Sequence, residues 1–194
     1  MKLVKLFALI CMCSAVFAQG EGNPEEAAAM KAWMDAGTPG KEHADLAKDA
    51  GEWDCVVKMW MDPKAPPMES KGTDHCEMIM GGRVLQGHFT SEFMGMPFHG
   101  ESMVGYSNFT KTYWSTWMDD MSTALMYTEG TASPDGKTVT FMGTMDDPAM
   151  NIKDKPFKQV FREIDDDHHV FESWDEIGTP NEFKAMEITY TRKK

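Results

Sequence analysis

Two cysteines, Cys55 and Cys76, have a spacing that suits covalent chemistry. The segment between them contains three prolines near its middle, which indicate a loop joining two strands. If these strands pair around a turn centred near Lys64–Pro67, the two cysteines face each other, and opposed residues have Cβ atoms about 4.5–5.5 Å apart, close to disulfide reach. An oxidising compartment would favour a Cys55–Cys76 bridge. Two buried free thiols, packed as small apolar groups, are the alternative.

Methionine and histidine could bind metals or cofactors. The chain has 19 methionines, and Met94, Met96 and His99 form the cluster best suited to Cu(I), which thioethers and imidazole bind. Methionine also fills irregular apolar space, so the lining of a core or pocket is the favoured interpretation. The favoured interpretation of His43 is a hydrogen bond that ties an expected helix to the rest of the domain, and haem ligation is the alternative. No cofactor is therefore predicted.

The remaining polar pairs predict no catalytic centre. Adjacent His168 and His169 point to opposite faces of a strand, so they cannot easily bind one ion. Paired acids such as Asp119-Asp120 are expected to cap backbone N–H groups at turns. The sequence contains no Gly-x-Ser-x-Gly elbow, phosphate-binding loop or His-Glu-x-x-His motif. No catalytic residue and no metal site is predicted, and enzymatic activity stays open.

The first eighteen residues are typical of a cleaved signal peptide. Lys2 and Lys5 precede the apolar run Leu6–Val16, and a small residue, Ala18, precedes the expected cleavage site. Export to the periplasm or the extracellular space is therefore predicted. Removing two lysines from 19 basic residues leaves 17 against 31 acidic ones, a net charge of −14. Such an acidic surface argues against nucleic acid and anionic membranes as partners, and no stable membrane insertion is expected.

The elements that must position these residues are two short helices followed by a series of strands. Asn23-Pro24-Glu25-Glu26 is an N-terminal helix signal for a helix to Ala36, and a second helix is expected from Lys41 to about Asp49. From Glu52 onward the apolar residues alternate with a period of two, which is typical of strands. Turn residues separate these strands, which are expected at about 52–60, 70–80, 83–94, 99–108, 111–119, 122–131, 137–145, 154–164, 168–177 and 182–192.

The short connections between about ten strands predict an all-β fold with an antiparallel sheet, because parallel strands need long crossovers. A sheet of this length tends to close on itself or to split into two layers. An up-and-down barrel with short N-terminal helices is predicted, and a two-layer β-sandwich is the alternative. The expected organisation is a signal peptide (1–18), a helical appendage or linker (19–37) and one barrel domain (38–194).

Four groups of residues resemble one bacterial family. They are Pro39-Gly40 and His43 ahead of Gly51-Glu52-Trp53; Met94-Gly95-Met96-Pro97-Phe98 with Gly100 and Gly105-Tyr106; Trp117–Thr123 leading to Glu129-Gly130-Thr131; and Met186–Arg192. Together they resemble the uncharacterised domain of unknown function 1579, over about residues 39–193. The resemblance implies a calycin-like or lipocalin-like barrel and no established activity. It also implies that Arg192 packs across Trp53, next to Gly51, as a structural anchor closing the barrel base.

A closed barrel of this size encloses either packed side chains or one small ligand. The favoured function is binding of a small apolar or amphipathic molecule inside the barrel. The alternatives are an enzyme acting on such a molecule at the barrel mouth, and a filled-core structural or interaction protein. The sequence does not specify an oligomeric state. The residues expected to line the pocket are Met59, Met78, Phe89, Met103, Trp117, Met126, Phe141, Phe161 and Trp174, chosen by which face of each strand is more apolar.

Overall fold

The structure is a computed structural model that describes residues 23–194, so the expected signal peptide lies outside the described residues. The chain divides into two compact units, one ending at Met34 and one formed by Asp35–Lys194. Helix α1 (Pro24–Gly37) starts where predicted, and the backbone N–H of Glu25 donates to the Asn23 side chain at 3.1 Å. Among the described residues, no helix is long and apolar enough to cross a membrane.

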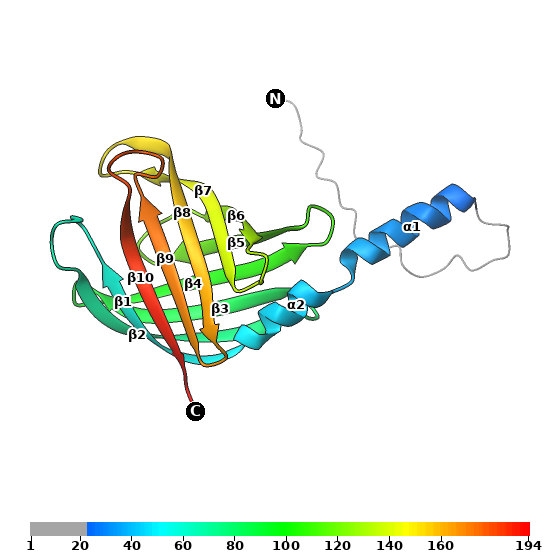
Figure 1. Cartoon of the computed structure of the whole chain (residues 1–194), viewed down its shortest axis with the longest axis horizontal. Coiled ribbons are helices and arrows are strands. Elements are labelled where there is room, and N and C mark those ends of the chain that lie inside the picture. The colour runs from blue at the N-terminus through cyan, green and yellow to red at the C-terminus, as the bar shows by residue number, and fades with distance from the viewer. Residues whose placement is uncertain (1–22) are drawn as a thin grey trace, which may run out of the picture. The chain divides into compact units, whose positions relative to one another are not determined.

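Ten antiparallel strands form a closed barrel in chain order, with β1 returning to pair with β10 (Figure 1). The predicted up-and-down barrel is therefore confirmed, and the sandwich alternative is wrong. The strands are β1 (Gly51–Met59), β2 (Met68–Ile79), β3 (Val84–Phe93), β4 (Met96–Ser107), β5 (Thr112–Asp119), β6 (Met126–Ala132), β7 (Thr138–Asp147), β8 (Ile152–Asp165), β9 (His168–Asp175) and β10 (Phe183–Arg192).

The strand that departs most from its predicted position is β6, which begins four residues later than the sequence pattern indicates. Side-chain oxygens hold the preceding segment as a loop. The backbone N–H of Met121 donates to Asp119 Oδ1 at 3.0 Å, and that of Ala124 donates to Ser122 Oγ at 3.1 Å. Such local hydrogen bonds compete with the sheet ladder, which then starts only at Met126.

The register of β1 and β2 corrects the predicted disulfide. Cys55 faces Gly72 and Cys76 faces Gly51, and both cysteines are free thiols. Four residues at about 3.4 Å each place the two Cα atoms about 14 Å apart along the strands, whereas a bridge needs Cα atoms within about 7 Å. The predicted turn centre was two residues too late. Asp62 organises the actual turn, since its carboxylate accepts from the Lys64 N–H at 2.9 Å and its carbonyl from the Ala65 N–H at 3.0 Å.

Helix α2 (Lys41–Leu46) and the 3₁₀ turn Ala47–Asp49 lie at one end of the barrel, here called the helical end. The backbone N–H of Gly40 donates to His43 Nδ1 at 3.0 Å, which caps the helix. The His43 ring, 5% exposed, contacts Tyr106 of β4 edge-on. His43 thus does tie the helix to the barrel, through ring packing, while its hydrogen bond stays within the helix turn.

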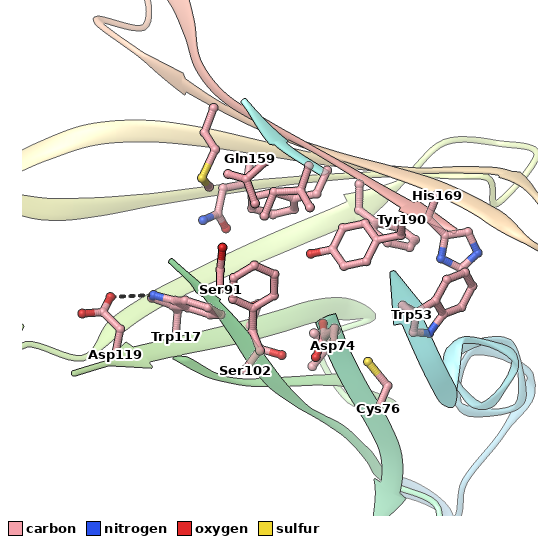
Figure 2. Close-up of a pocket in the computed structure, with 18 of the residues that line it drawn as sticks. Trp53, Asp74, Cys76, Ser91, Ser102, Trp117, Asp119, Gln159, His169 and Tyr190 are labelled. Carbon is pink, nitrogen blue, oxygen red and sulfur yellow. Dashed lines mark hydrogen bonds between the residues drawn. The ribbon is translucent and has the colours of Figure 1, made fainter. Parts of the chain in front are cut away.

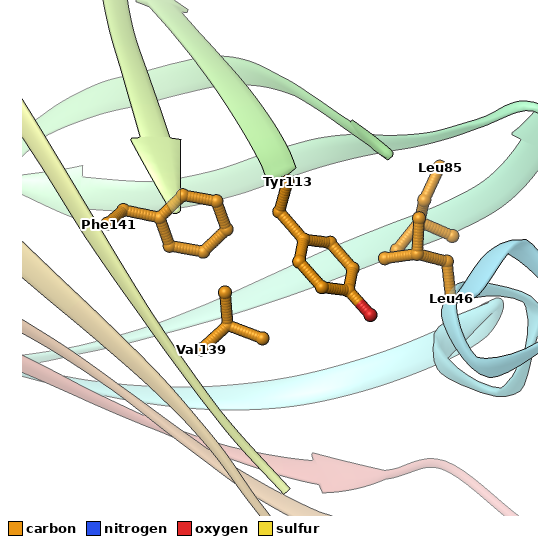
Figure 3. Packing of buried hydrophobic residues seen from close by; sticks show 5 residues of the cluster. All are labelled: Leu46, Leu85, Tyr113, Val139 and Phe141. Carbon is orange, nitrogen blue, oxygen red and sulfur yellow. The ribbon is translucent and has the colours of Figure 1, made fainter. Parts of the chain in front are cut away.

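Leu46 carries the helix into the barrel interior. It is 8% exposed and packs in one cluster with Leu85, Tyr113, Val139 and Phe141 (Figure 3). These partners come from β3, β5 and β7, so the cluster joins the helix to strands from well-separated parts of the chain. The apolar surface that α2 offers is small, and Leu46 is where it is buried.

Candidate ligand-binding cavity

A cavity of about 1130 Å³ lies inside the barrel. Its wall is mostly apolar, and it extends from Leu46 and Asp49 at the helical end to Met94 and Met121 at the opposite end, here called the mouth. Met94 is 75% exposed, so the cavity reaches the surface there. Ligand pockets of drug-sized molecules occupy about 300–1,000 Å³, so the interior is large enough for one such molecule.

Three aromatic side chains form one side of the cavity, here called the aromatic wall. Phe98 and Trp117 stack with ring centroids 6.3 Å apart, and Phe89 meets both rings nearly edge-on. The Trp117 indole N–H donates to Asp119 Oδ2 at 2.8 Å, which fixes the ring orientation (Figure 2). Trp117 also lies over Gly100, where an added Cβ would be 2.2 Å from the ring. Glycine at 100 therefore lets the indole lie flat against β4.

The mouth is rich in methionine. Six methionines that line the cavity belong to strand ends and loops of this end of the barrel: Met59, Met68, Met94, Met121, Met126 and Met186. Met59 pairs with Met68 on one side and with Met186 on the other, which makes a continuous row across three strands. Flexible thioether side chains adapt to apolar molecules of different shape.

Asp74 interrupts the apolar interior. It lies on β2 between Trp53 of β1 and Phe89 of β3, is only 7% exposed and lines the cavity. Its Oδ1 accepts no hydrogen bond from the described part of the chain. Burial raises the pKa of the Asp74 carboxyl, and a hydrogen bond from the Cys76 thiol opposes that rise. An unsatisfied buried carboxyl oxygen costs folding free energy and is a feature that requires an explanation.

Hydroxyl and thiol groups surround Asp74. Ser102 of β4 reaches toward it across Gly87, where an added Cβ would be 2.6 Å from Ser102 Oγ and 3.1 Å from Asp74 Oδ1. Tyr190 of β10 projects into the same space, and burial, followed by the charge of Asp74, raises the pKa of its phenol (Figure 2). Burial also raises the pKa of the Cys76 thiol. Residues from β2, β4 and β10 thus form a polar cluster of Asp74, Cys76, Ser102 and Tyr190.

The helical end contains a second group of interacting side chains around Trp53, which is 1% exposed. Arg192 Cζ lies 4.1 Å from the Trp53 ring centroid, and the guanidinium donates to the carbonyls of Ala50 at 2.8 Å and Lys48 at 2.6 Å. Gly51 has a φ of +135°, and a Cβ there would be 2.7 Å from Arg192. Gly51, Trp53 and Arg192 thus lie together where β1 and β10 meet.

Two titratable groups of this end have displaced pKa values. Burial, with the nearby negative charge of Glu163, raises the pKa of Asp49 to about 7. Burial, with the positive charge of Arg192, lowers the pKa of His169 to about 4. His169 packs on Trp53 at 4.4 Å and on Phe161 at 5.1 Å, so it is a neutral aromatic component of the core at neutral pH.

Six of the nine residues expected to line the pocket do lie on the cavity wall: Met59, Phe89, Trp117, Met126, Phe141 and Phe161. Whether they bind a ligand stays a prediction. Met78, Met103 and Trp174 do not line it. Met78 faces inward but packs against the Leu46 cluster at the helical end. The inward residues of β4 and β9 have the opposite parity to Met103 and Trp174, and Lys158 covers the Trp174 ring at 4.7 Å.

The Met94, Met96 and His99 cluster considered for copper is not brought together. Met94 lines the cavity, whereas His99 lies on the outer face of β4 with Nδ1 2.9 Å from Asp120. Across residues 23–194, no group of three or more His, Cys, Asp or Glu side chains is arranged to hold a metal ion.

Sequence reasoning missed Asp74, Ser102, His169 and Tyr190, all of which line the cavity. The signal for Asp74 was present. Residues 74, 76 and 78 share one face of β2, so placing Met78 inside also places Asp74 inside. Because an aspartate is usually exposed to solvent, Asp74 was not expected inside the barrel, and choosing the inner face by its apolar residues overlooked it.

Fold and cavity together define a closed, ten-stranded antiparallel β-barrel with a hollow, mostly apolar interior. The chain belongs to the family described as Protein of unknown function (DUF1579), which matches residues 38–192. The suspected family membership is thereby confirmed. No curated protein matches the sequence significantly.

Solved structures resemble the barrel at low sequence identity. The crystal structure of Rv2717c from M. tuberculosis aligns with a TM-score of 0.58 and 12% identity, covering 81% of this chain and 100% of that chain. A redesigned β-barrel, b11L5F_LGL, aligns with a TM-score of 0.39 and 12% identity, covering 79% of this chain and 96% of that one. The first of these similarities supports the barrel fold and nothing more specific.

Proposed function

We propose that the protein is an exported carrier that binds a small apolar or amphipathic molecule inside its barrel. The observation that supports this is the cavity of about 1130 Å³ with a mostly apolar wall. A filled core of Trp and Met would have argued for a purely structural or interaction protein, and the interior is instead hollow. The resemblance to calycin-like barrels supports the same proposal, because it implies a ligand in the barrel interior.

The mouth offers the route for a ligand. Its methionine row (Met59, Met68, Met186) lies beside the aromatic wall, so an apolar molecule entering there stays in contact with side chains that can adjust to it. Among residues 23–194, His169 is the one histidine on the cavity wall, and it is packed against Trp53 at the helical end. The His99–Asp120 pair near the mouth does not line the cavity, and no other described histidine meets a carboxylate on the cavity wall at the mouth, so no observation favours the enzyme alternative.

Native mass spectrometry of the protein purified from its own host tests the carrier proposal. We expect a mass excess over the polypeptide that is released by organic solvent and identified as one small amphipathic molecule. Titration with N-phenyl-1-naphthylamine, a neutral apolar dye, provides an independent check, since its fluorescence rises in an apolar pocket. A protein that carries no molecule and takes up no dye would contradict the proposal.

Export is tested on the same preparation. We expect the full chain to lose residues 1–18 and to appear outside the cytoplasm with Gln19 as its first residue. Removal of residues 2–18 should retain the protein in the cytoplasm. Intact-mass measurement of fractionated cells separates these outcomes, and a full-length cytoplasmic protein would contradict this part of the proposal.

A further inference from the structure

We infer that the carried molecule is an amine, with an ammonium group that binds Asp74 and an aliphatic or aromatic body that lies along the aromatic wall. The inference rests on the proposed function, because it requires a ligand in the cavity. It adds the chemical class of that ligand and the side chain that selects it.

The first argument is the state of the Asp74 carboxylate. It is more than nine-tenths buried, it lines the cavity, and its Oδ1 accepts no hydrogen bond from residues 23–194. The Cys76 thiol, a weak donor, leaves this oxygen unsatisfied, and a buried carboxylate is costly unless a cation or several donors reach it. A ligand ammonium group supplies both a positive charge and up to three N–H donors at once.

The second argument is the arrangement around Asp74. Ser102 Oγ and Asp74 Oδ1 both point at the space above Gly87, since an added Cβ there would lie within 3.1 Å of each. Tyr190 and Cys76 border the same space (Figure 2). Hydroxyl oxygens accept hydrogen bonds from the ammonium protons that Asp74 leaves free. Because Gly87 has no side chain, the Ser102 hydroxyl and the Asp74 carboxyl can come close together over it and face the same ligand group.

The third argument is the charge of the cavity wall. Seven acidic residues line it, Asp45, Asp49, Glu69, Asp74, Glu92, Asp119 and Glu163, against two lysines, Lys71 and Lys137. No arginine is among the described residues of the wall. An anionic ligand such as a fatty acid would bring another negative charge close to Asp74 without a cation to pair with. A cationic ligand has the opposite and favourable electrostatics.

The fourth argument is the distance over which the apolar wall continues. Phe89 is the direct cross-strand partner of Asp74, and its ring contacts Phe98 and Trp117 in the direction of the mouth. An amphiphile with its head at Asp74 therefore has its body against the aromatic wall and its far end at the mouth methionines. The cavity thus presents Asp74, then the aromatic wall and then the methionines of the mouth, in that order.

Competition among three probes of equal chain length tests the inference. Dodecylamine, dodecanol and dodecanoate, each below its micelle concentration and at 150 mM salt, would be titrated against protein-bound N-phenyl-1-naphthylamine. We expect dodecylamine to displace the dye at a concentration roughly tenfold or more below that of dodecanol, since a charge-assisted hydrogen bond in a buried site is worth at least one decade of affinity. Dodecanoate should be the weakest of the three.

Two variants separate Asp74 from the general acidity of the protein. Asp74→Asn keeps the side-chain shape and should bring dodecylamine to the affinity of dodecanol, while dye and dodecanol binding persist and show that the variant is folded. Glu77→Gln removes an exposed carboxylate from the outer face of the same strand, away from the cavity wall, and should leave the amine preference intact. Salt at 150 mM screens exposed charges over about 8 Å, so the remaining preference reports the buried site.

The outcomes distinguish this inference from the proposed function. Two results would overturn the inference and leave the carrier proposal standing, provided that the dye binds. In the first, dodecanoate binds with the same affinity as dodecylamine. In the second, Asp74→Asn keeps the full preference for dodecylamine. Failure of the dye and of all three probes to bind would overturn both.

Discussion

Trp53 is the residue on which the contacts of the helical end converge. Its indole N–H donates to the Asp49 carbonyl at 2.9 Å, one side of the ring meets Arg192, and His169 packs at 4.4 Å. The Arg192 guanidinium is itself held by carbonyls of the 3₁₀ turn, so the ring, the cation and the chain entering β1 form one unit. The Trp53 side chain thus links the segment before β1 to the place where β1 pairs with β10.

Replacing Trp53 by alanine removes this unit. We expect Trp53→Ala to lose about 3–5 kcal/mol of unfolding free energy, the usual cost of deleting a large buried aromatic side chain. Urea unfolding measures it. Trp33→Ala is the matched control, since Trp33 is 80% exposed on α1 and its loss should change stability by less than about 0.5 kcal/mol. A Trp53→Ala protein as stable as its parent would show that the anchor is dispensable.

Asp49 makes stability depend on pH. Its pKa is near 7 in the folded protein and near 3.8 when exposed, so the folded state holds a proton that the unfolded state has lost between these values. The contribution of Asp49 is present below pH 4 and is lost as pH rises through 7. The Asp49→Asn variant lacks this loss. Its stability relative to the parent should therefore increase from pH 4 to pH 8 in urea unfolding series.

A suitable control for Asp49 is Asp45, whose pKa is lowered by hydrogen bonds from Lys41 and Lys48. Asp45→Asn should show no such increase between pH 4 and pH 8. An equal rise in both variants would mean that the acidity of the whole protein, and not the burial of Asp49, controls the pH dependence.

The two cysteines should behave as buried thiols. Burial raises the pKa of Cys55 to about 12 and also raises that of Cys76, and thiolates are the reactive form. We expect no alkylation of Cys55 and Cys76 by iodoacetamide at pH 8 in the native protein, and alkylation of both after denaturation without reductant. Intact mass reads both. If the denatured chain is alkylated only after reduction, the result would support the Cys55–Cys76 disulfide predicted from the sequence.

At the scale of the strands, glycine and aromatic residues are paired across neighbours. Gly100 lies under Trp117, Gly105 under Trp114 and Gly130 under Phe141, with an added Cβ 2.2–2.5 Å from the ring in each case. The large ring covers the backbone that glycine leaves bare. On the inner face, these pairs shape the cavity wall by letting aromatic rings lie along the sheet.

Gly100→Ala tests this pairing where it borders the cavity. The methyl group would overlap the Trp117 ring, so the indole must leave the aromatic wall, at a cost of about 1–3 kcal/mol for overpacking. Urea unfolding and the Trp fluorescence spectrum report the two effects. Gly37→Ala is the control, because nothing lies within 4 Å of its added Cβ. Unchanged stability and fluorescence in Gly100→Ala would contradict the role assigned to Gly100.

The sequence predicts the elements well because each strand is bounded by turn residues and carries its own alternation. It predicts register and facing poorly, because these depend on partners far along the chain. The turn organised by Asp62 moved the register of β1 and β2 and so separated Cys55 from Cys76. The prediction that Met103 and Trp174 face inward was wrong. Long side chains can cover apolar residues on the outer face, as Lys158 covers Trp174, so the outer face of a strand can be as apolar in sequence as the inner one.

For the whole molecule, the cavity links ligand binding to stability. A core of this size that is hollow lacks contacts that a filled one would have, and a bound molecule restores them on the folded side only. At a free concentration one hundred times its dissociation constant, a ligand should raise the unfolding free energy by about 2.7 kcal/mol. Thermal unfolding with increasing dodecylamine measures the shift. A midpoint independent of concentration would mean that the probe does not bind the native barrel.

The pairing of β1 with β10 also determines when the barrel can close during synthesis. Arg192 Nη1 binds the carbonyl of Ala50, 142 positions earlier in the chain, and the backbone N–H of Lys193 donates to Glu52. During synthesis the barrel cannot close until its last strand has emerged, and contacts of such sequence separation form slowly. Until then β1 presents an unpaired edge that other chains can join. If the chain, whose export is proposed above, is exported unfolded, this delay would favour its passage, because the barrel cannot close before the last strand is present.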